Sequence, residues 1–462
     1  MGLFNNNIEI KKENPFEHDK LYRKSEIENL TNLFELVDNQ LVLAINSPWG
    51  TGKTTFLRMW ETYLGSKEEL INKYEVIYFN AWENDDCLDP LVSIIGEMKD
   101  SIEKVNKTNW DNIKENGKKL IRKLTPLVVK VATAGLVSSN DVHLEDKVKD
   151  AIIDASGNVF NVDEYIEQKR IRINFKEELS KYQENLQKTV VFFIDELDRC
   201  RPTFAIETLE RIKHLFNLEN FIFVLGIDKE SLSNSIKVIY GNGTDINGYL
   251  ARFIDIEYTL DETGRGDYVN YLLEKYISGK TVSSRYNSLS YIVPKISDLF
   301  KMSLRNSEKF IVTLYLISKT NGNTYTTSEI YLVSFLLALS KFDKNLYFKI
   351  KNKTINLTQL IKELDEKISI EKWFNENEIG FIVKGRLMRI LCDVDMYNEM
   401  LNKSKEFENI NKDKQTDEVN IYKLCLSECS DLNNRFRRED AQNELKKVIK
   451  LVDIYSKFEI TQ

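Results

Sequence analysis

Residues 47–55 read Ser-Pro-Trp-Gly-Thr-Gly-Lys-Thr-Thr, and this stretch decides the fold that we expect for the chain. Gly50 and Gly52 let the backbone approach phosphate oxygens closely, and Lys53 can reach the β- and γ-phosphates of a nucleotide. The Thr54 hydroxyl is placed to bind Mg²⁺. The pattern predicts a phosphate-binding loop made of Ser47, Pro48, Trp49, Gly50, Thr51, Gly52, Lys53, Thr54 and Thr55.

The segments on either side of the loop support this interpretation over a chance glycine-rich turn. The apolar run Leu41–Asn46 is typical of a strand, and residues 55–60 continue as a helix whose N-terminus favours a bound anion. One position departs from the pattern G-x-x-x-x-G-K-[ST], because its leading glycine is Ser47 here. A serine at this position can strain the first turn or weaken nucleotide affinity, but it removes no phosphate ligand.

A second stretch, Asp-Glu-Leu-Asp-Arg at 195–199, follows the uninterrupted apolar run Thr189–Ile194. Such a run suits a strand that is buried on both faces of a parallel sheet. A carboxylate at the tip of this strand can hold Mg²⁺, and we assign that role to Asp195. Glu196 is the natural base to polarise an attacking water, which points to hydrolysis. The alternative is that the charged residues after Asp195 form only a solvated turn.

Four sequence blocks carry a resemblance to a known family. They are Ser-Pro-Trp-Gly-Thr-Gly-Lys-Thr-Thr at 47–55, Tyr-Phe-Asn-Ala-Trp-Glu at 78–83, Ile-Asp-Glu-Leu-Asp-Arg-Cys at 194–200 and Phe-Val-Leu-Gly-Ile-Asp at 223–228. Together they resemble the KAP P-loop NTPases, which belong to the additional-strand division with the AAA+ and STAND ATPases. The resemblance covers roughly residues 1–260. It implies an intracellular bacterial ATPase that uses ATP and Mg²⁺, often found in phage-resistance or plasmid-exclusion loci.

The resemblance also implies an α/β fold, in which a parallel sheet with strand order 5-1-4-3-2 is flanked by helices. The remaining strands are expected at 75–80, 221–228 and 254–258. This order places the ends of strands two, three and four around the γ-phosphate. Asn80 would then hold Glu196, and Asp228 would orient the lytic water. The alternatives are that Asn80 only caps a loop and that Asp228 caps the following helix.

Three arginines have roles that rest on the resemblance alone. Arg252 precedes the fifth strand, where related ATPases present a basic residue to the γ-phosphate of a neighbouring subunit, so this role requires a homo-oligomer. KAP relatives often have lysine at this point. Arg305 begins an amphipathic helix and resembles a second sensor, and Arg23 is expected to border the adenine. The alternative for Arg252 and Arg305 is an ordinary surface ion pair.

Many KAP members carry transmembrane helices between the two Walker motifs, which are here the phosphate loop at 47–55 (Walker A) and the stretch that begins at Asp195 (Walker B). The most apolar part of that interval is Leu124–Val137, which contains Lys130 and is followed by polar residues. A spanning helix needs about 20 predominantly apolar residues. We therefore expect a packed helix or an interfacial segment without stable membrane insertion, and a cytoplasmic protein.

Composition supports a folded protein of the reducing cytosol. The 462 residues suffice for about three domains, and 42% hydrophobic residues with only 6 prolines exclude a disordered chain. The net charge of −7 argues against a global polyanion-binding surface, although that sum would hide a local basic groove. The 5 cysteines form no C-x-x-C pair, and the N-terminus lacks the basic and apolar blocks of a signal peptide.

The pattern along the chain predicts four regions. They are an NTPase core at 1–95 and 186–264, a helical insertion at 96–185, a helical lid or bundle at 265–400 and a C-terminal helical region at 401–462. The apolar stretch Ile330–Leu339 is too short to span a bilayer and is expected in the core of the bundle. Residues 402–420 are polar and are expected to link the bundle to the last helix.

Three functions remain open at this point. The leading one is an ATP-hydrolysing switch or assembly ATPase of KAP type in anti-phage defence, with an effector protein encoded nearby as its partner. A second is a remodelling ATPase that nucleic acid stimulates. The third is a slow, nucleotide-bound scaffold, which the serine at position 47 would favour.

Overall fold

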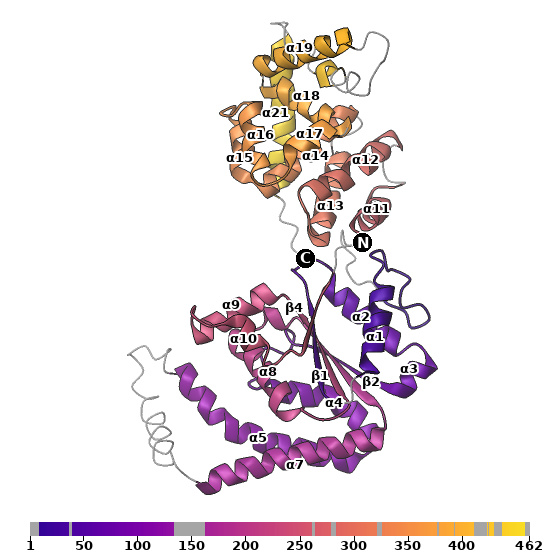
Figure 1. Cartoon of the computed structure of the whole chain (residues 1–462), viewed down its shortest axis with the longest axis vertical. Coiled ribbons are helices and arrows are strands. Elements are labelled where there is room, and N and C mark those ends of the chain that lie inside the picture. The colour runs from indigo at the N-terminus through magenta and orange to yellow at the C-terminus, as the bar shows by residue number, and fades with distance from the viewer. Residues whose placement is uncertain are drawn as a thin grey trace. The chain divides into compact units, whose positions relative to one another are not determined.

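The protein is described here from a computed structural model. The structure describes residues 9–36, 39–133, 162–260, 264–278, 283–320, 326–376, 378–391, 393–410, 423, 425–428 and 437–457. The chain divides into two compact units between Glu262 and Thr263 (Figure 1).

The first unit is built on a parallel sheet of five strands in the order β2-β3-β4-β1-β5. The strands are β1 (Leu41–Asn46), β2 (Tyr74–Asn80), β3 (Thr189–Asp195), β4 (Phe221–Ile227) and β5 (Ile256–Thr259). Asn80 pairs with Asp195, and Asn46 pairs with Ile227, so the carboxyl ends of these four strands lie at one edge. The predicted α/β fold and its strand order are confirmed.

The fifth strand begins two residues later than predicted, at Ile256 instead of Ile254. Asp255 is the reason, because its Oδ2 accepts a hydrogen bond from the N–H of Val42 at 2.8 Å. A side chain thus takes the place of a backbone carbonyl in the ladder at this point. Regular pairing starts only where Ile256 lies opposite Leu43.

Alternate residues of the strands point to opposite faces, and each face is covered by helices. One face is covered by α1 (Lys24–Phe34) and α2 (Lys53–Leu64), with α3 (Glu68–Lys73) beside β2. Trp60 of α2 is fully buried there, stacked on Phe34 at 5.3 Å and edge-on to Phe193 at 5.5 Å between ring centroids. Its indole N–H donates to Thr31 Oγ1 at 2.9 Å, so the largest core side chain also satisfies its polar group.

The other face carries α4 (Pro90–Val105), α8 (Pro202–Leu215), α9 (Lys229–Tyr240) and α10 (Ile246–Leu250). On this face Phe192 stacks on Phe223 with ring centroids 5.7 Å apart. Asp89 caps α4 by accepting from the N–H of Leu91, and the guanidinium of Arg211 on α8 binds the same carboxylate at 2.8 Å. This buried ion pair locks the first turn of α4 to α8.

The described residues of the interval 96–185, where the sequence predicts a helical insertion, are largely helical. The interval contains α5 (Lys107–Thr133) and α7 (Val162–Leu186), which run side by side (Figure 1). The boundary predicted at residue 95 falls inside α4, whose apolar side packs against the sheet. The first residues of Leu124–Val137 continue α5 as far as Thr133, and the rest lie outside the described residues. No described helix is both long enough and apolar enough to cross a membrane.

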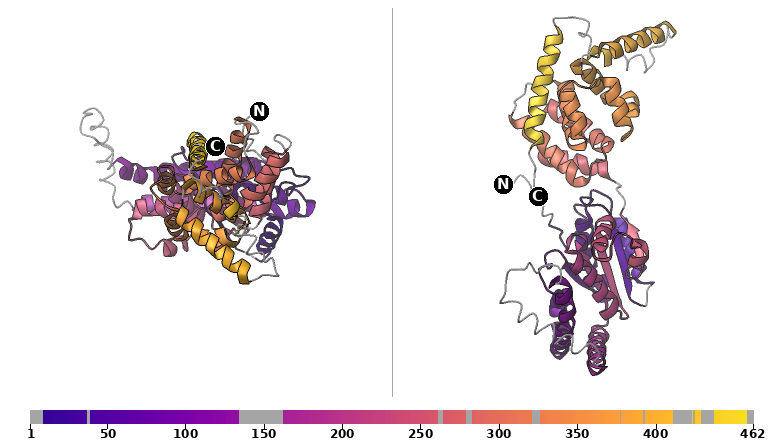
Figure 2. Two further views of the ribbon diagram at one scale, coloured as in Figure 1. Left: turned by 90° about the horizontal axis from the view of Figure 1, so that it is seen from above. Right: turned by 90° about the vertical axis from the view of Figure 1, so that its left-hand side faces the viewer.

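The second unit is helical throughout its described part. Its helices are α11 (Arg265–Tyr276), α12 (Ser283–Leu299), α13 (Leu304–Thr320), α14 (Thr327–Phe342), α15 (Lys344–Lys351), α16 (Leu357–Asp365), α17 (Ile370–Glu376), α18 (Glu378–Leu391), α19 (Val394–Ile410) and α21 (Arg437–Ser456). Every residue from Tyr331 to Ser340 is buried, so α14 forms the core of this bundle, as predicted. It packs against α12, α18 and α21, and α21 runs along it (Figure 2).

The polar stretch predicted as a linker is helical in its first part, because α19 continues to Ile410. An ion pair between Glu399 and Lys403, at 2.7 Å and one turn apart, supports this helix. Residues 411–420 lie outside the described part of the chain.

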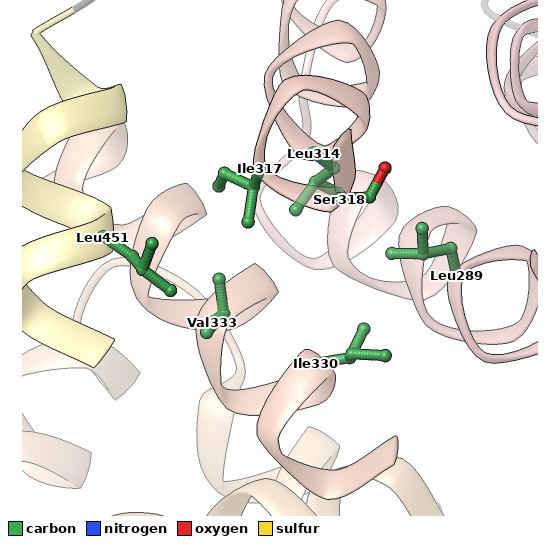
Figure 3. Close-up of a pocket in the computed structure, with 7 residues that line it drawn as sticks. All are labelled: Leu289, Leu314, Ile317, Ser318, Ile330, Val333 and Leu451. Carbon is green, nitrogen blue, oxygen red and sulfur yellow. The ribbon is translucent and has the colours of Figure 1, made fainter. Parts of the chain in front are cut away.

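A small apolar cavity of about 30 Å³ lies between helices of the second unit (Figure 3). It is lined by Leu289, Leu314, Ile317, Ser318, Ile330, Val333 and Leu451. The lining side chains come from α12, α13, α14 and α21, so the cavity marks the place where these four helices meet imperfectly.

Candidate nucleotide site

The phosphate loop joins β1 to α2 at the carboxyl edge of the sheet. Gly50 and Gly52 have φ angles of 83° and 90°, in the left-handed region that favours glycine. Gly52 is the residue immediately before α2, so the loop ends on the N-terminus of a 12-residue helix. Backbone N–H groups and the positive end of a helix dipole together form a site for an anion.

Ser47, the departure from the loop pattern, is buried and hydrogen-bonded. Its N–H donates to the carbonyl of Ile227 at 3.1 Å, which ties the start of the loop to β4. Its hydroxyl lies 2.6 Å from the hydroxyl of Thr51, and Thr51 donates to the carbonyl of Pro48 at 2.8 Å. Ser47 is not among the described non-glycine residues with positive φ. Position 47 therefore braces the loop without backbone strain.

Lys53 is buried at the first position of α2 and faces the loop. Its ammonium donates to the carbonyl of Ser47 and, at 3.4 Å, to that of Pro48. Burial lowers the pKa of Lys53, and the carboxylates of Asp198, Asp228 and Asp195 oppose this shift. A cation held inside the loop is suited to bind the phosphates of a nucleotide.

Asp195 ends β3 and is only 1% exposed. Its Oδ1 accepts from the N–H of Glu196 at 2.9 Å, and its Oδ2 accepts from the hydroxyl of Tyr78 at 2.7 Å. Gly226 on β4 leaves room for this side chain, because a Cβ at that position would lie 2.9 Å from Asp195 Oδ1. The carboxylate is therefore fixed from three sides.

Tyr78 and Gly226 were not singled out from the sequence as site residues. Tyr78 occupies β2, next to β3, and the guanidinium of Arg58 lies 3.3 Å from its ring centroid. Burial and the adjacent Asp195 raise the pKa of the Tyr78 hydroxyl, so it stays a hydrogen-bond donor. Both residues stand in the blocks that carry the family resemblance, at 78–83 and 223–228, and this was the available signal.

Glu196 has φ 62° and ψ 24°, a left-handed conformation that is uncommon for a non-glycine residue. Its carboxylate lies 2.8 Å from Arg199 Nη1. Burial raises the pKa of Glu196, whereas Arg199 and a hydrogen bond from Asn80 lower it. The guanidinium of Arg199 lies 5.5 Å from the ring centroid of Trp82. The charged residues after Asp195 therefore form a structured cluster rather than a solvated turn.

Asn80 and Asp228 both make the capping contacts that were the alternatives to a functional role. Asn80 Oδ1 accepts from the N–H groups of Trp82 at 3.1 Å and Glu83 at 3.3 Å. Asp228 Oδ1 accepts from the N–H of Glu230 at 3.1 Å and caps α9. Asn80 also lies near enough to Glu196 to favour the ionised form of its carboxyl group.

The three arginines lie at different elements of the two units. Arg252 is exposed and precedes β5, in which Ile256 pairs with Leu43. It lies toward the amino edge of the sheet, because the loop starts at Ser47, four residues or about 13 Å beyond Leu43 along β1. Arg305 lies in the first turn of α13, in the second unit. Arg23 is buried just before α1, with its guanidinium 5.8 Å from the ring centroid of Phe56 on α2.

The residues present fit a nucleotide with its magnesium ion. Thr54 is exposed at the N-terminus of α2, and Asp195 is fixed at the tip of β3, which β4 separates from β1. Within the described residues, no cluster of three or more acidic, histidine or cysteine side chains could hold a metal alone. Mg²⁺ in such sites keeps several waters and binds one or two protein ligands together with phosphate oxygens. Thr54 and Asp195 are the residues that would hold it here.

The sequence model of the KAP family P-loop domain matches residues 23–321. No curated protein sequence matches this chain. Among solved structures, the ORC2 protein of Aeropyrum pernix in its ADPNP–ADP complexes is 12% identical, with a TM-score of 0.32 over 93% of this chain and 94% of that chain. The ORC1 protein of Aeropyrum pernix in complex with DNA is 13% identical, with a TM-score of 0.34 over 92% of each chain. Because the family match spans more than half of the sequence and both Walker motifs, the chain belongs to the KAP family of P-loop NTPases.

Proposed function

We propose that the protein binds ATP with Mg²⁺ and hydrolyses it to ADP and phosphate. The observation that carries this proposal is the position of Glu196, which follows Asp195 at the end of β3. Only β4 separates β3 from β1, the strand that leads into the phosphate loop. A carboxylate next to the magnesium ligand is placed to take a proton from an attacking water. A protein that only held nucleotide would need no base at this position.

Each residue of the site has a distinct part in the proposed reaction. The loop N–H groups and Lys53 bind the phosphates and stabilise charge that develops on the γ-phosphate. Thr54 and Asp195 would hold Mg²⁺, which would offset the negative charge of the phosphate oxygens. Glu196 accepts the proton of the lytic water, and Asn80 orients Glu196. The pairing of Glu196 with Arg199 must loosen before Glu196 can act, which favours slow turnover in the free protein.

The test compares Lys53→Ala with Glu196→Gln, using Lys99→Ala on the exposed side of α4 as a control. Lys53→Ala should abolish nucleotide binding, whereas Glu196→Gln should bind MgATP and lose about 10²- to 10⁴-fold in kcat. Binding is measured by calorimetry and turnover by phosphate release, with GTP as the competing nucleotide. Normal turnover in Glu196→Gln would refute its assignment as the base.

We further propose that the protein acts as a nucleotide-dependent switch or assembly ATPase in anti-phage defence. Arg252 supports a homo-oligomer, because its place toward the amino edge keeps it away from the loop of its own subunit. It would then serve the γ-phosphate bound by a second copy. A cytoplasmic protein that signals to an effector encoded nearby is the expected setting.

Two measurements separate this proposal from the other candidates. Stimulation of ATP turnover by DNA or RNA would indicate a nucleic-acid remodeller. Tight nucleotide binding with negligible turnover under all conditions would indicate a scaffold, which the Glu196–Arg199 pair favours over a remodeller.

A further inference from the structure

A side-chain hydrogen bond ties the phosphate loop to the turn after β3, and the proposed function does not account for it. The indole N–H of Trp49 donates to Oδ2 of Asp198. Trp49 lies in the loop, and Asp198 lies in the short helix η1 (Leu197–Arg199) that follows Glu196. The two residues are 149 positions apart, so this contact exists only in the folded protein.

The exposures of the two side chains show why this bond matters. Trp49 is 50% exposed, whereas Asp198 is 6% exposed. A half-exposed indole gains only part of the free energy of burial, so its polar bond is the more specific restraint on its position. A buried carboxylate is costly unless hydrogen bonds and opposite charges offset its desolvation. The Trp49 indole therefore satisfies Oδ2 of Asp198, whereas Oδ1 of Asp198 is buried without a hydrogen-bond partner among the described residues.

The short helix η1 that carries Asp198 also packs against β4 and α9. Burial raises the pKa of Asp198, and Trp49, the charge of Lys53 and the backbone N–H of Asp228 favour its ionised form. The turn after β3 thus contacts two other parts of the site: the phosphate loop, through the Trp49–Asp198 bond, and β4, which Asp228 follows. These are the parts whose relative position determines where a γ-phosphate meets Glu196.

The contacts of Lys53 connect this arrangement to the nucleotide. Its ammonium binds the carbonyls of Ser47 and Pro48, the two residues directly before Trp49. A lysine that turns toward entering phosphates leaves these carbonyls, and the backbone next to Trp49 is released. Asp198 contributes more than any other carboxylate to the electrostatic environment of Lys53. Phosphate entry therefore acts on both partners of the Trp49–Asp198 bond.

We propose that Asp198 is a positioning residue that holds the phosphate loop, through Trp49, against the turn that carries the base. In this role the Trp49–Asp198 bond also responds to phosphates in the loop. The inference rests on the proposed function, because it concerns the same nucleotide site. It adds Asp198, which acts on the phosphate loop through Trp49, and it gives the Trp49 indole the role of linking the loop to the turn after β3.

The experiment uses the full chain and four variants: Trp49→Phe, Asp198→Ala, their combination, and Tyr240→Phe as control. Tyr240 is 49% exposed on α9 in the same unit, so its variant also removes one polar group from a half-exposed aromatic residue. A hydrogen bond to a charged group is worth enough to lower kcat by about 10- to 100-fold in each single variant. The double variant should lose no more than the worse single variant, because both remove the same bond.

Tryptophan emission gives a second measurement that does not depend on turnover. A non-hydrolysable ATP analogue with Mg²⁺ should change the emission of the wild type, and Trp49→Phe should lack that change. Asp198→Ala should show altered Trp49 emission before any nucleotide is added. If Asp198→Ala does not fold, Trp49→Phe provides the test, because replacing a half-exposed ring should not unfold the protein. The positioning role then requires that Trp49→Phe lowers kcat.

The outcomes separate this inference from the proposed function. A wild type that neither binds nor hydrolyses MgATP overturns the proposed function. A wild type that hydrolyses MgATP, with Trp49→Phe and Asp198→Ala turning over at its rate, overturns the positioning role alone. Additive losses in the double variant would also overturn it, because the two side chains would then act separately.

Discussion

Replacing Gly226 by alanine tests the account of the site most directly, because it displaces Asp195 without changing any charged group. A Cβ at position 226 would lie 2.6 Å from Leu57 Cδ1 and 2.9 Å from Asp195 Oδ1. These separations are about 0.8 and 0.5 Å short of the ordinary contact distance of 3.4 Å. Leu57 is fully buried, so it has little space into which to move.

Asp195 is equally restrained, because both of its carboxylate oxygens are hydrogen-bonded. Relief of the clash must therefore stretch its bond to Tyr78 or to the N–H of Glu196. Overpacking of this kind costs about 1–3 kcal/mol of stability. A shift of a catalytic group by about 1 Å can cost about 100-fold in rate, so we expect kcat to fall by about that factor.

The control is Gly96→Ala in the middle of α4, where an added Cβ meets nothing within 4 Å. Removing a helix-interior glycine should stabilise the protein by about 0.5–1 kcal/mol and leave turnover unchanged. Urea unfolding measures the stability, and phosphate release at saturating MgATP measures kcat. Wild-type stability and turnover in Gly226→Ala would refute the close approach of Asp195 to β4.

Three further predictions address other parts of the molecule. Mixing Arg252→Ala with Glu196→Gln subunits should restore part of the turnover, because one interface then combines an intact arginine with an intact base, and such an arginine is worth about 10³-fold in rate. No rescue, together with turnover that is independent of protein concentration, would exclude action in trans. Arg211→Ala leaves Asp89 buried without its cation and should cost about 3–5 kcal/mol in urea unfolding. Lys73→Ala, which removes exposed pairs with Glu35 and Glu69, should leave the unfolding midpoint nearly unchanged. Val333→Ile adds a methyl group to the cavity of about 30 Å³ and should stabilise the protein by up to about 0.7 kcal/mol. Val312→Ile adds the same group to the filled core and should destabilise the protein. Equal effects of the two substitutions on stability would show that the cavity closes in solution.

The sequence by itself was enough for the elements whose signal is local. The apolar run at 189–194 predicts β3, and the glycines, lysine and threonine of the loop predict phosphate binding. Both depend on residues that are near neighbours in the chain. The bundle core at α14 was predictable for the same reason, since a helix that is apolar all round must be buried.

Element ends were less predictable, because contacts from elsewhere decide them. Asp255 replaces a ladder carbonyl with its side chain and delays β5, although its sequence alternates like that of a strand. The polar composition of 402–410 suggests a linker, but those residues extend α19. A pattern along the chain does not report which partner a segment will meet.

Only the tertiary structure decided how the side chains of the site are held. The bond between Tyr78 and Asp195 joins residues 117 positions apart, and the bond between Trp49 and Asp198 joins residues 149 positions apart. Gly226 is needed because β4 packs against the side chain that ends β3. Such contacts follow from strand order and register, and they arise only when distant segments pair. The sequence thus determined which chemistry the chain carries, and the folded sheet determined which residues hold it in place.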